Sequence, residues 1–158
     1  MSISQAKVEA DLRSMGLQMG DDVLVHSSYK SIIGGVCGGP SAVVAALLAV
    51  IGPSGTLVVP TFTHSGTTMF DPQLRCAQQL PWTCDACHGC VHPTSGNSPT
   101  KNGAICEAAR AHPSAVRSWH PTHAATAIGP AAVELVRDDL ERGPLVHSCP
   151  HRIVESRL

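Results

Sequence analysis

The feature that most constrains the fold is a strand, loop, helix and strand pattern within residues 23–61. Residues 23–25 are apolar and mostly β-branched, and a glycine-rich loop follows at 32–39. Residues 42–51 are apolar nearly all round, which is typical of a buried helix, and residues 56–61 form a second buried-strand pattern. Two parallel strands need such a crossover, which is nearly always right-handed. The pattern therefore predicts an α/β fold with a parallel strand pair.

Polar side chains follow each of these two strands. His26, Ser27 and Ser28 come directly after the first strand, and Thr61 and Thr63 lie at the end of the second. In open α/β sheets, ligands bind outside the carboxyl ends of the strands. We therefore expect these side chains to face one cleft.

The rest of the chain carries weaker patterns. Residues 65–102 show no clear periodicity and are rich in Pro, Gly, Ser, Cys and His, so we interpret them as a long insertion-like loop within a single domain spanning residues 1–158. The other segments predict a helix at 4–15 with Ser4 as a possible N-cap, a helix at 103–111, a loop at 117–121, a strand at 124–128 and a helix at 131–140.

Charge and hydropathy exclude two broad classes of partner. The 11 Lys and Arg residues against 12 Asp and Glu residues give a net charge of −1, so nucleic acid is not an expected partner. The longest apolar run, 42–51, is half of what a bilayer requires, and the N-terminus lacks a signal-peptide pattern. We expect a cytoplasmic protein that does not enter a membrane.

The glycine-rich loop leads into the amino end of the predicted buried helix. Backbone N–H groups and the helix dipole favour an anion at such a place, and Gly35 lies at the centre of the loop. The spacing fits neither a Walker loop nor a dinucleotide fingerprint. The alternative interpretation is a tight loop that uses glycine for positive φ.

A second candidate cluster lies within residues 117–123. Arg117 supplies a fixed charge suited to a phosphate, and Ser118 supplies a hydroxyl. His120 and His123 are candidate general bases, because imidazole accepts a proton near neutral pH. The alternative is a polar surface loop.

Four cysteines within residues 76–90 have the spacing of soft metal ligands. Cys84, Cys87 and Cys90 follow one another at x-x spacing, with Cys76 upstream, and four such thiolates suit a tetrahedral zinc site. Part of an iron–sulfur pattern has similar spacing. The alternative is a reduced, thiol-rich insertion without metal.

Taken together, these motifs resemble the aminoglycoside 3-N-acetyltransferase family. The resemblance rests on short segments that occur in the family's order, at residues 23–28, 38–44, 52–63, 70–72, 103–105 and 116–123.

The resemblance implies a three-layer α/β/α sandwich and the transfer of an acetyl group from acetyl-CoA to the 3-amino group of an aminoglycoside, an antibiotic-resistance activity. His120 or His123 as the base is argued from chemistry rather than from the family. The residues expected to contact CoA are His26, Ser27, Ser28, Ser31, Gly35, Thr61, Thr63, Arg117 and Ser118.

The sequence also departs from the family pattern. Family members continue well past the position of Leu158, and Asp139 stands where members carry a proton-handling histidine. The sandwich is therefore expected to be incomplete at its C-terminus, which would expose a sheet edge and favour a homo-oligomer. These departures leave open an inactive CoA-binding remnant of the family. The cysteine cluster leaves open a second alternative, a small zinc-binding interaction module.

Overall fold

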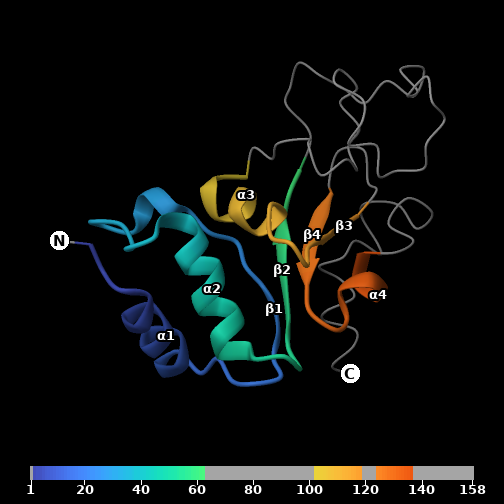
Figure 1. The fold of residues 1–158 in the computed structure, drawn as a ribbon, viewed down its shortest axis with the longest axis horizontal. Coiled ribbons are helices and arrows are strands. Elements are labelled where there is room, and N and C mark those ends of the chain that lie inside the picture. Colours follow the sequence, from blue (N-terminus) through green and yellow to red (C-terminus); the bar gives the residue numbers. More distant parts are fainter. Residues whose placement is uncertain (1, 63–101, 119–123, 137–158) are drawn as a thin grey trace, which may run out of the picture.

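One mixed sheet organises the part of the chain that the computed structural model describes, residues 2–62, 102–118 and 124–136 (Figure 1). Within these ranges four strands pair in the order β1-β2-β4-β3. The elements are α1 (Gln5–Ser14), β1 (Asp22–Leu24), the short 3-10 helix η1 (Tyr29–Ser31), α2 (Gly39–Ile51), β2 (Thr56–Pro60), α3 (Ala104–Arg110), β3 (Val116–Arg117), β4 (Ala125–Ile128) and α4 (Ala132–Val136).

The predicted crossover unit is confirmed. Strands β1 and β2 are parallel, with Leu24 opposite Val58, and α2 lies between them along the chain. Helix α2 begins at Gly39 and contains the whole apolar run 42–51. Pro40 fits the first turn, where its missing N–H costs nothing, and Gly38 at φ 87° serves as the N-cap.

Strand β4 makes the sheet mixed, which the sequence did not predict. It pairs antiparallel with β2 on one side and with β3 on the other. The predicted loop at 117–121 is wrong at its first residue, because Arg117 belongs to β3. A strand of two residues is too short to produce a recognisable alternation.

Strand β2 is buried on both faces, and this produces the predicted layers. Leu57 and Val59 join the core that α2 and α3 cover, whereas Val58 joins a second core with Leu135 of α4. The α/β/α prediction is therefore confirmed for the described residues, with α1 packed against the outer side of α2 (Figure 1). Ala125 and Ala127 of β4 lie in this second core together with α4 residues.

The smaller elements follow their local signals. Ser4 caps α1, as predicted, by accepting a hydrogen bond from the Lys7 N–H at 3.2 Å. Helices α3 and α4 each begin one residue later than predicted. None of the helices in the described ranges is both long and apolar enough to cross a membrane.

Gly129, where β4 turns toward α4, is expected to tolerate no side chain. Its φ is 140°, and a Cβ atom there would lie 2.5 Å from the Gly55 carbonyl oxygen. We expect Gly129→Ala to lower the free energy of unfolding by about 2–5 kcal/mol, from backbone strain together with overpacking. Urea denaturation measures this change.

Gly16→Ala is the matched control. Gly16 also has a positive φ, 99°, but a Cβ atom there would meet nothing within 4 Å. Strain alone should cost about 1–2 kcal/mol. Equal losses in the two variants would show that the close approach of Gly129 to β2 is not part of the folded state.

Candidate functional site

Three strands end at the same edge of the sheet. Strands β1 and β2 are parallel, and β3 runs in the direction of β2 because both are antiparallel to β4. The polar residues that follow these strands therefore come together at one edge, although they are far apart in the sequence (Figure 1). We call this the carboxyl edge of the sheet.

The segment after β1 presents polar groups at this edge. His26, Ser28 and Ser31 are exposed, and η1 follows directly. Ser27 is half-buried, and its Oγ atom is shielded from solvent and has no hydrogen-bond partner among the residues that the structure describes. Continued by three residues, the register of β1 and β2 places Ser27 at the level of Thr61. A shielded hydroxyl without a partner is costly, so it indicates a position that a ligand group can satisfy.

Thr61 uses its polar groups inside the protein. Its Oγ1 atom lies 2.9 Å from Thr126 Oγ1, and its N–H donates to the Ala124 carbonyl at 2.8 Å. The residue is fully buried. The side chain that we expected to contact CoA therefore braces the end of β2.

Ser118, like Thr61, uses its polar groups inside the protein. It is fully buried, and its Oγ atom accepts a hydrogen bond from the Ala125 N–H at 2.9 Å. Its own N–H donates to the Ala125 carbonyl at 2.8 Å. These bonds extend the pairing of β3 and β4 beyond Arg117, the last residue of β3. Ser118 therefore stabilises the carboxyl edge through contacts inside the protein.

Arg117 brings a positive charge to the carboxyl edge. One of its Nη2–H groups donates to the Thr61 carbonyl oxygen at 2.5 Å. Burial, together with the nearby Arg110 charge, lowers the pKa of Arg117 to about 10, while the Glu107 charge opposes the shift. Arg117 is still a cation at neutral pH, and its partly desolvated charge attracts anions more strongly than an exposed one.

The glycine-rich loop is built as a tight turn. Tyr29 closes it, because its hydroxyl accepts a hydrogen bond from the Val36 N–H at 3.1 Å. Gly35 has φ 68° and approaches that hydroxyl closely. Neighbouring amides also donate inside the protein, from Gly35 to Ile32, from Cys37 to Ile3 and from Gly39 to Val36. These four N–H groups already donate within the protein and are not free for an anion, and Gly35 contributes its backbone conformation to the turn.

Seven predicted site residues lie outside the described residues. The described ranges contain no group of three or more His, Cys, Asp or Glu side chains that could hold a metal ion. The zinc site and the general base therefore stay predictions from the sequence. The residues concerned are Thr63, His120 and His123, and the proposed zinc ligands Cys76, Cys84, Cys87 and Cys90.

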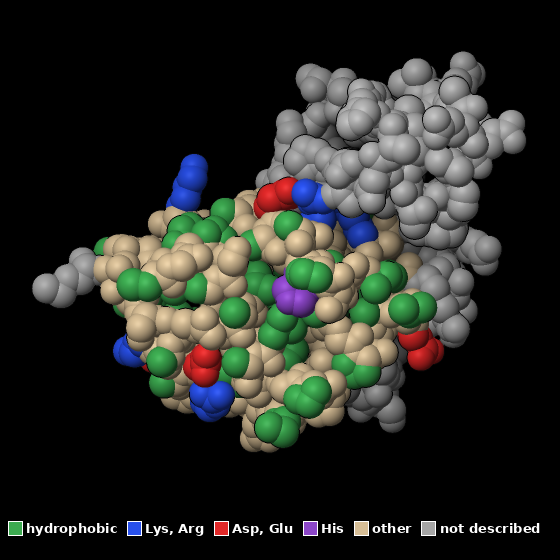
Figure 2. Space-filling view, in the orientation of Figure 1, with side chains coloured by type: hydrophobic (Ala, Val, Ile, Leu, Met, Phe, Trp, Pro, Cys, Tyr) green, Lys and Arg blue, Asp and Glu red, His purple; other side chains and the backbone are tan. Residues whose placement is uncertain are grey.

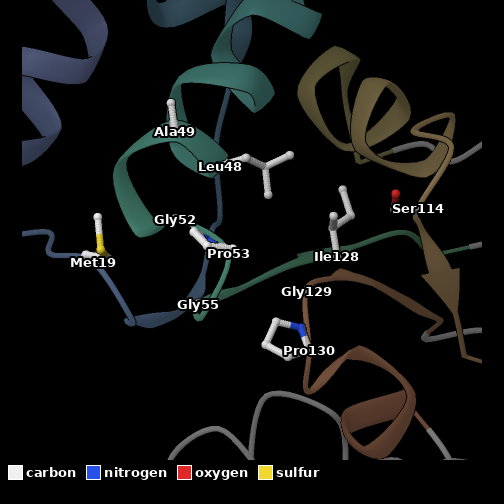
Figure 3. A pocket seen from close by; sticks show the side chains of 10 residues that line it. All are labelled: Met19, Leu48, Ala49, Gly52, Pro53, Gly55, Ser114, Ile128, Gly129 and Pro130. Carbon is white, nitrogen blue, oxygen red and sulfur yellow. The ribbon is translucent and has the colours of Figure 1, made fainter.

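A groove lies at the opposite end of the sheet (Figure 3). Its volume is about 670 Å³, and its lining includes Met19, Leu48, Pro53, Ser114 and Ile128. None of the described residues that line it carries a charged side chain. It therefore lacks the groups that would recognise a phosphate or a polycation. Among the described residues that Figure 2 shows, charged side chains of both signs are scattered rather than gathered into one patch.

Two residues of the carboxyl edge were missed by the sequence reasoning. Asn102 accepts a hydrogen bond from the Phe62 N–H at 2.7 Å through its Oδ1 atom. Thr126 meets Thr61, as described above. A signal existed for Thr126, which is polar within an alanine-rich strand pattern, whereas Asn102 stands in a stretch without periodicity and gives no such signal.

Sequence comparison shows which known proteins this chain is similar to. The family model for aminoglycoside 3-N-acetyltransferases matches residues 24–157. The chain belongs to the aminoglycoside 3-N-acetyltransferase family. Aminoglycoside N(3)-acetyltransferase IX of Micromonospora chalcea is 34% identical over 151 residues, which is 90% of this chain and 50% of that protein.

Solved structures show the same relationship. The apoenzyme of the aminoglycoside acetyltransferase AAC(3)-IVa matches with a TM-score of 0.74 and 28% identity, over 98% of this chain and 51% of that one. The acetyltransferase AAC-IIIb, solved as a binary complex with CoASH, matches with a TM-score of 0.71 and 25% identity, over 99% and 57%. The chain thus spans about half the length of the relatives that it matches.

Two serines predicted for the site should differ in their effect on stability. Ser118→Ala leaves the buried Ala125 N–H without a partner, so we expect a loss of about 1–3 kcal/mol in unfolding free energy without any ligand. Ser28→Ala changes an exposed side chain, and we expect a change within about 0.5 kcal/mol. Urea denaturation of both variants tests this, and a stable Ser118→Ala variant would contradict the bracing role.

Proposed function

We propose that the protein binds acetyl-CoA at the carboxyl edge of the sheet and transfers its acetyl group to the 3-amino group of an aminoglycoside. The observation that carries the proposal is the Ser27 hydroxyl, which has no partner within the described ranges, at the edge where Arg117 supplies a positive charge. Membership of the family adds the reaction class.

The chemistry of CoA fits the groups at this edge. Its pantetheine arm carries amides, which need hydroxyl or imidazole partners, and Ser27, Ser28, Ser31 and His26 supply them. Its phosphates need a cation, which Arg117 supplies. Gly35 and Tyr29 determine the conformation of the adjoining glycine-rich loop. Thr61 and Ser118 stabilise the carboxyl edge through buried hydrogen bonds.

The reaction requires a base and a thioester that is held in a fixed orientation. The lone pair of the acceptor amine attacks the thioester carbonyl carbon, forming the C–N bond of the amide. The C–S bond then breaks, and CoA leaves as the thiolate, which is protonated. The proton lost from the amine passes to a base, and His120 and His123 are our candidates for that base.

Thiol release is the direct test of turnover. We expect the purified chain to release CoA thiol from acetyl-CoA only when an aminoglycoside is added, and the product to carry one acetyl group at the 3-amino position. A thiol-reactive dye measures the release, and mass spectrometry with NMR locates the acetyl group. Binding of acetyl-CoA in calorimetry without any release, across a panel of aminoglycosides, would support the inactive CoA-binding remnant instead.

The charge at the edge gives a pH prediction. In Arg117→Lys, the desolvation that lowers the arginine pKa should also lower the lysine pKa from its usual value of about 10.4. Because a base loses its charge as pH rises through its pKa, we expect acetyl-CoA affinity of the variant to fall by about three- to tenfold between pH 7.5 and pH 9.5. Calorimetry at both pH values measures this loss.

Arg13→Lys is the control, since Arg13 is an exposed residue of α1 that pairs with Glu9. The wild type and this control should change much less than Arg117→Lys over the same pH range. A fall of equal size in all three proteins would mean that the charge of Arg117 does not contribute to binding.

A further inference from the structure

A single peptide group at the end of β2 is held from both sides. The Thr61 carbonyl oxygen accepts a hydrogen bond from Arg117, and the Phe62 N–H of the same peptide group donates to Asn102 Oδ1. The two side chains lie 56 and 40 residues away along the chain. We call this arrangement the peptide clamp.

The neighbouring contacts leave this peptide group little freedom. The Thr61 N–H is bonded to the Ala124 carbonyl, and the Thr61 hydroxyl is bonded to Thr126. These polar contacts therefore fix the orientation of the Thr61–Phe62 peptide group at the end of β2.

Stability alone gives a weak reason for such contacts. Thr61, Ser118 and Thr126 are buried beside a core of Val and Ala side chains. Burying polar groups is costly, and well-packed apolar residues are often at least as stabilising. What a satisfied polar network provides is a unique geometry, which a binding site requires.

We propose that Asn102 is a positioning residue of the acetyl-CoA site, acting through the Thr61–Phe62 peptide group together with Arg117. This inference rests on the proposed function. Asn102 fixes the N–H side of the peptide group, so that Arg117 is held at the carbonyl side with its charge at the carboxyl edge. A displacement of about 1 Å in such a support is enough to weaken a site markedly.

The clamp itself is tested by hydrogen exchange at one amide. In Asn102→Ala the Phe62 N–H loses its acceptor, so we expect its exchange, followed by NMR, to accelerate by about tenfold or more. In Asn102→Asp a carboxylate oxygen replaces the amide oxygen, and slow exchange should return. Unchanged exchange in Asn102→Ala, or fast exchange in Asn102→Asp, would overturn the clamp.

The positioning role is tested by calorimetry with acetyl-CoA under conditions in which every variant is folded. We expect the Kd of Asn102→Ala to rise by about tenfold, as for the loss of one orienting hydrogen bond, and the Kd of Asn102→Asp to return toward that of the wild type.

Leu48→Ala is the control for a general loss of stability. Leu48 is half-buried in α2 and lines the groove at the opposite end of the sheet. This variant should lose stability yet bind acetyl-CoA as the wild type does. Equal weakening in Leu48→Ala and Asn102→Ala would overturn the positioning role.

Failure of the proposed function has a different signature. If the wild type does not bind acetyl-CoA at all, the proposed function is wrong. The positioning role of Asn102 toward acetyl-CoA is then wrong as well. The exchange of the Phe62 amide decides separately whether the clamp exists.

Discussion

The burial of β2 on both faces is the constraint on which the rest of the structure depends. A strand that is covered on both sides must have helices above and below it, and its apolar run must alternate between two cores. Leu57 and Val59 serve one core and Val58 serves the other. Once β2 is central, the polar residues that follow it and its neighbours are brought to one edge, because β1, β2 and β3 run in the same direction.

At that edge the polar residues divide into two groups with different physical roles. His26, Ser28 and Ser31 are exposed, and the Ser27 hydroxyl has no partner in the part of the chain that the structure describes, so we propose this group as the one that meets a ligand. Thr61 and Ser118 are buried and bonded to the protein. Arg117 belongs to both groups, since it holds the end of β2 and carries the charge. Residue type alone does not distinguish a serine that contacts a ligand from a serine that stabilises the fold. Burial and hydrogen bonding distinguish the two.

Much of the fold could be predicted from the sequence, for identifiable reasons. The crossover unit was predictable because apolar runs separated by glycine-containing loops mark both strands and the helix between them. Strand β3 was not predictable, because its two residues carry no periodicity and gain their strand geometry only by pairing with β4. The same limit applies to the site. Ser27 and Arg117 stand beside recognisable motifs, whereas Asn102 becomes meaningful only when the fold brings it to the Phe62 amide.

We propose that acetyl-CoA binds at the carboxyl edge of the sheet and not in the apolar groove at its other end. Amide chemical shifts recorded by NMR during titration with acetyl-CoA test this claim residue by residue. We expect saturable shifts at residues 26–31, 61–62 and 117–118, with little change at residues 52–55 and 128–130. Shifts gathered at 52–55 and 128–130, or no shifts at any of these positions, would contradict it.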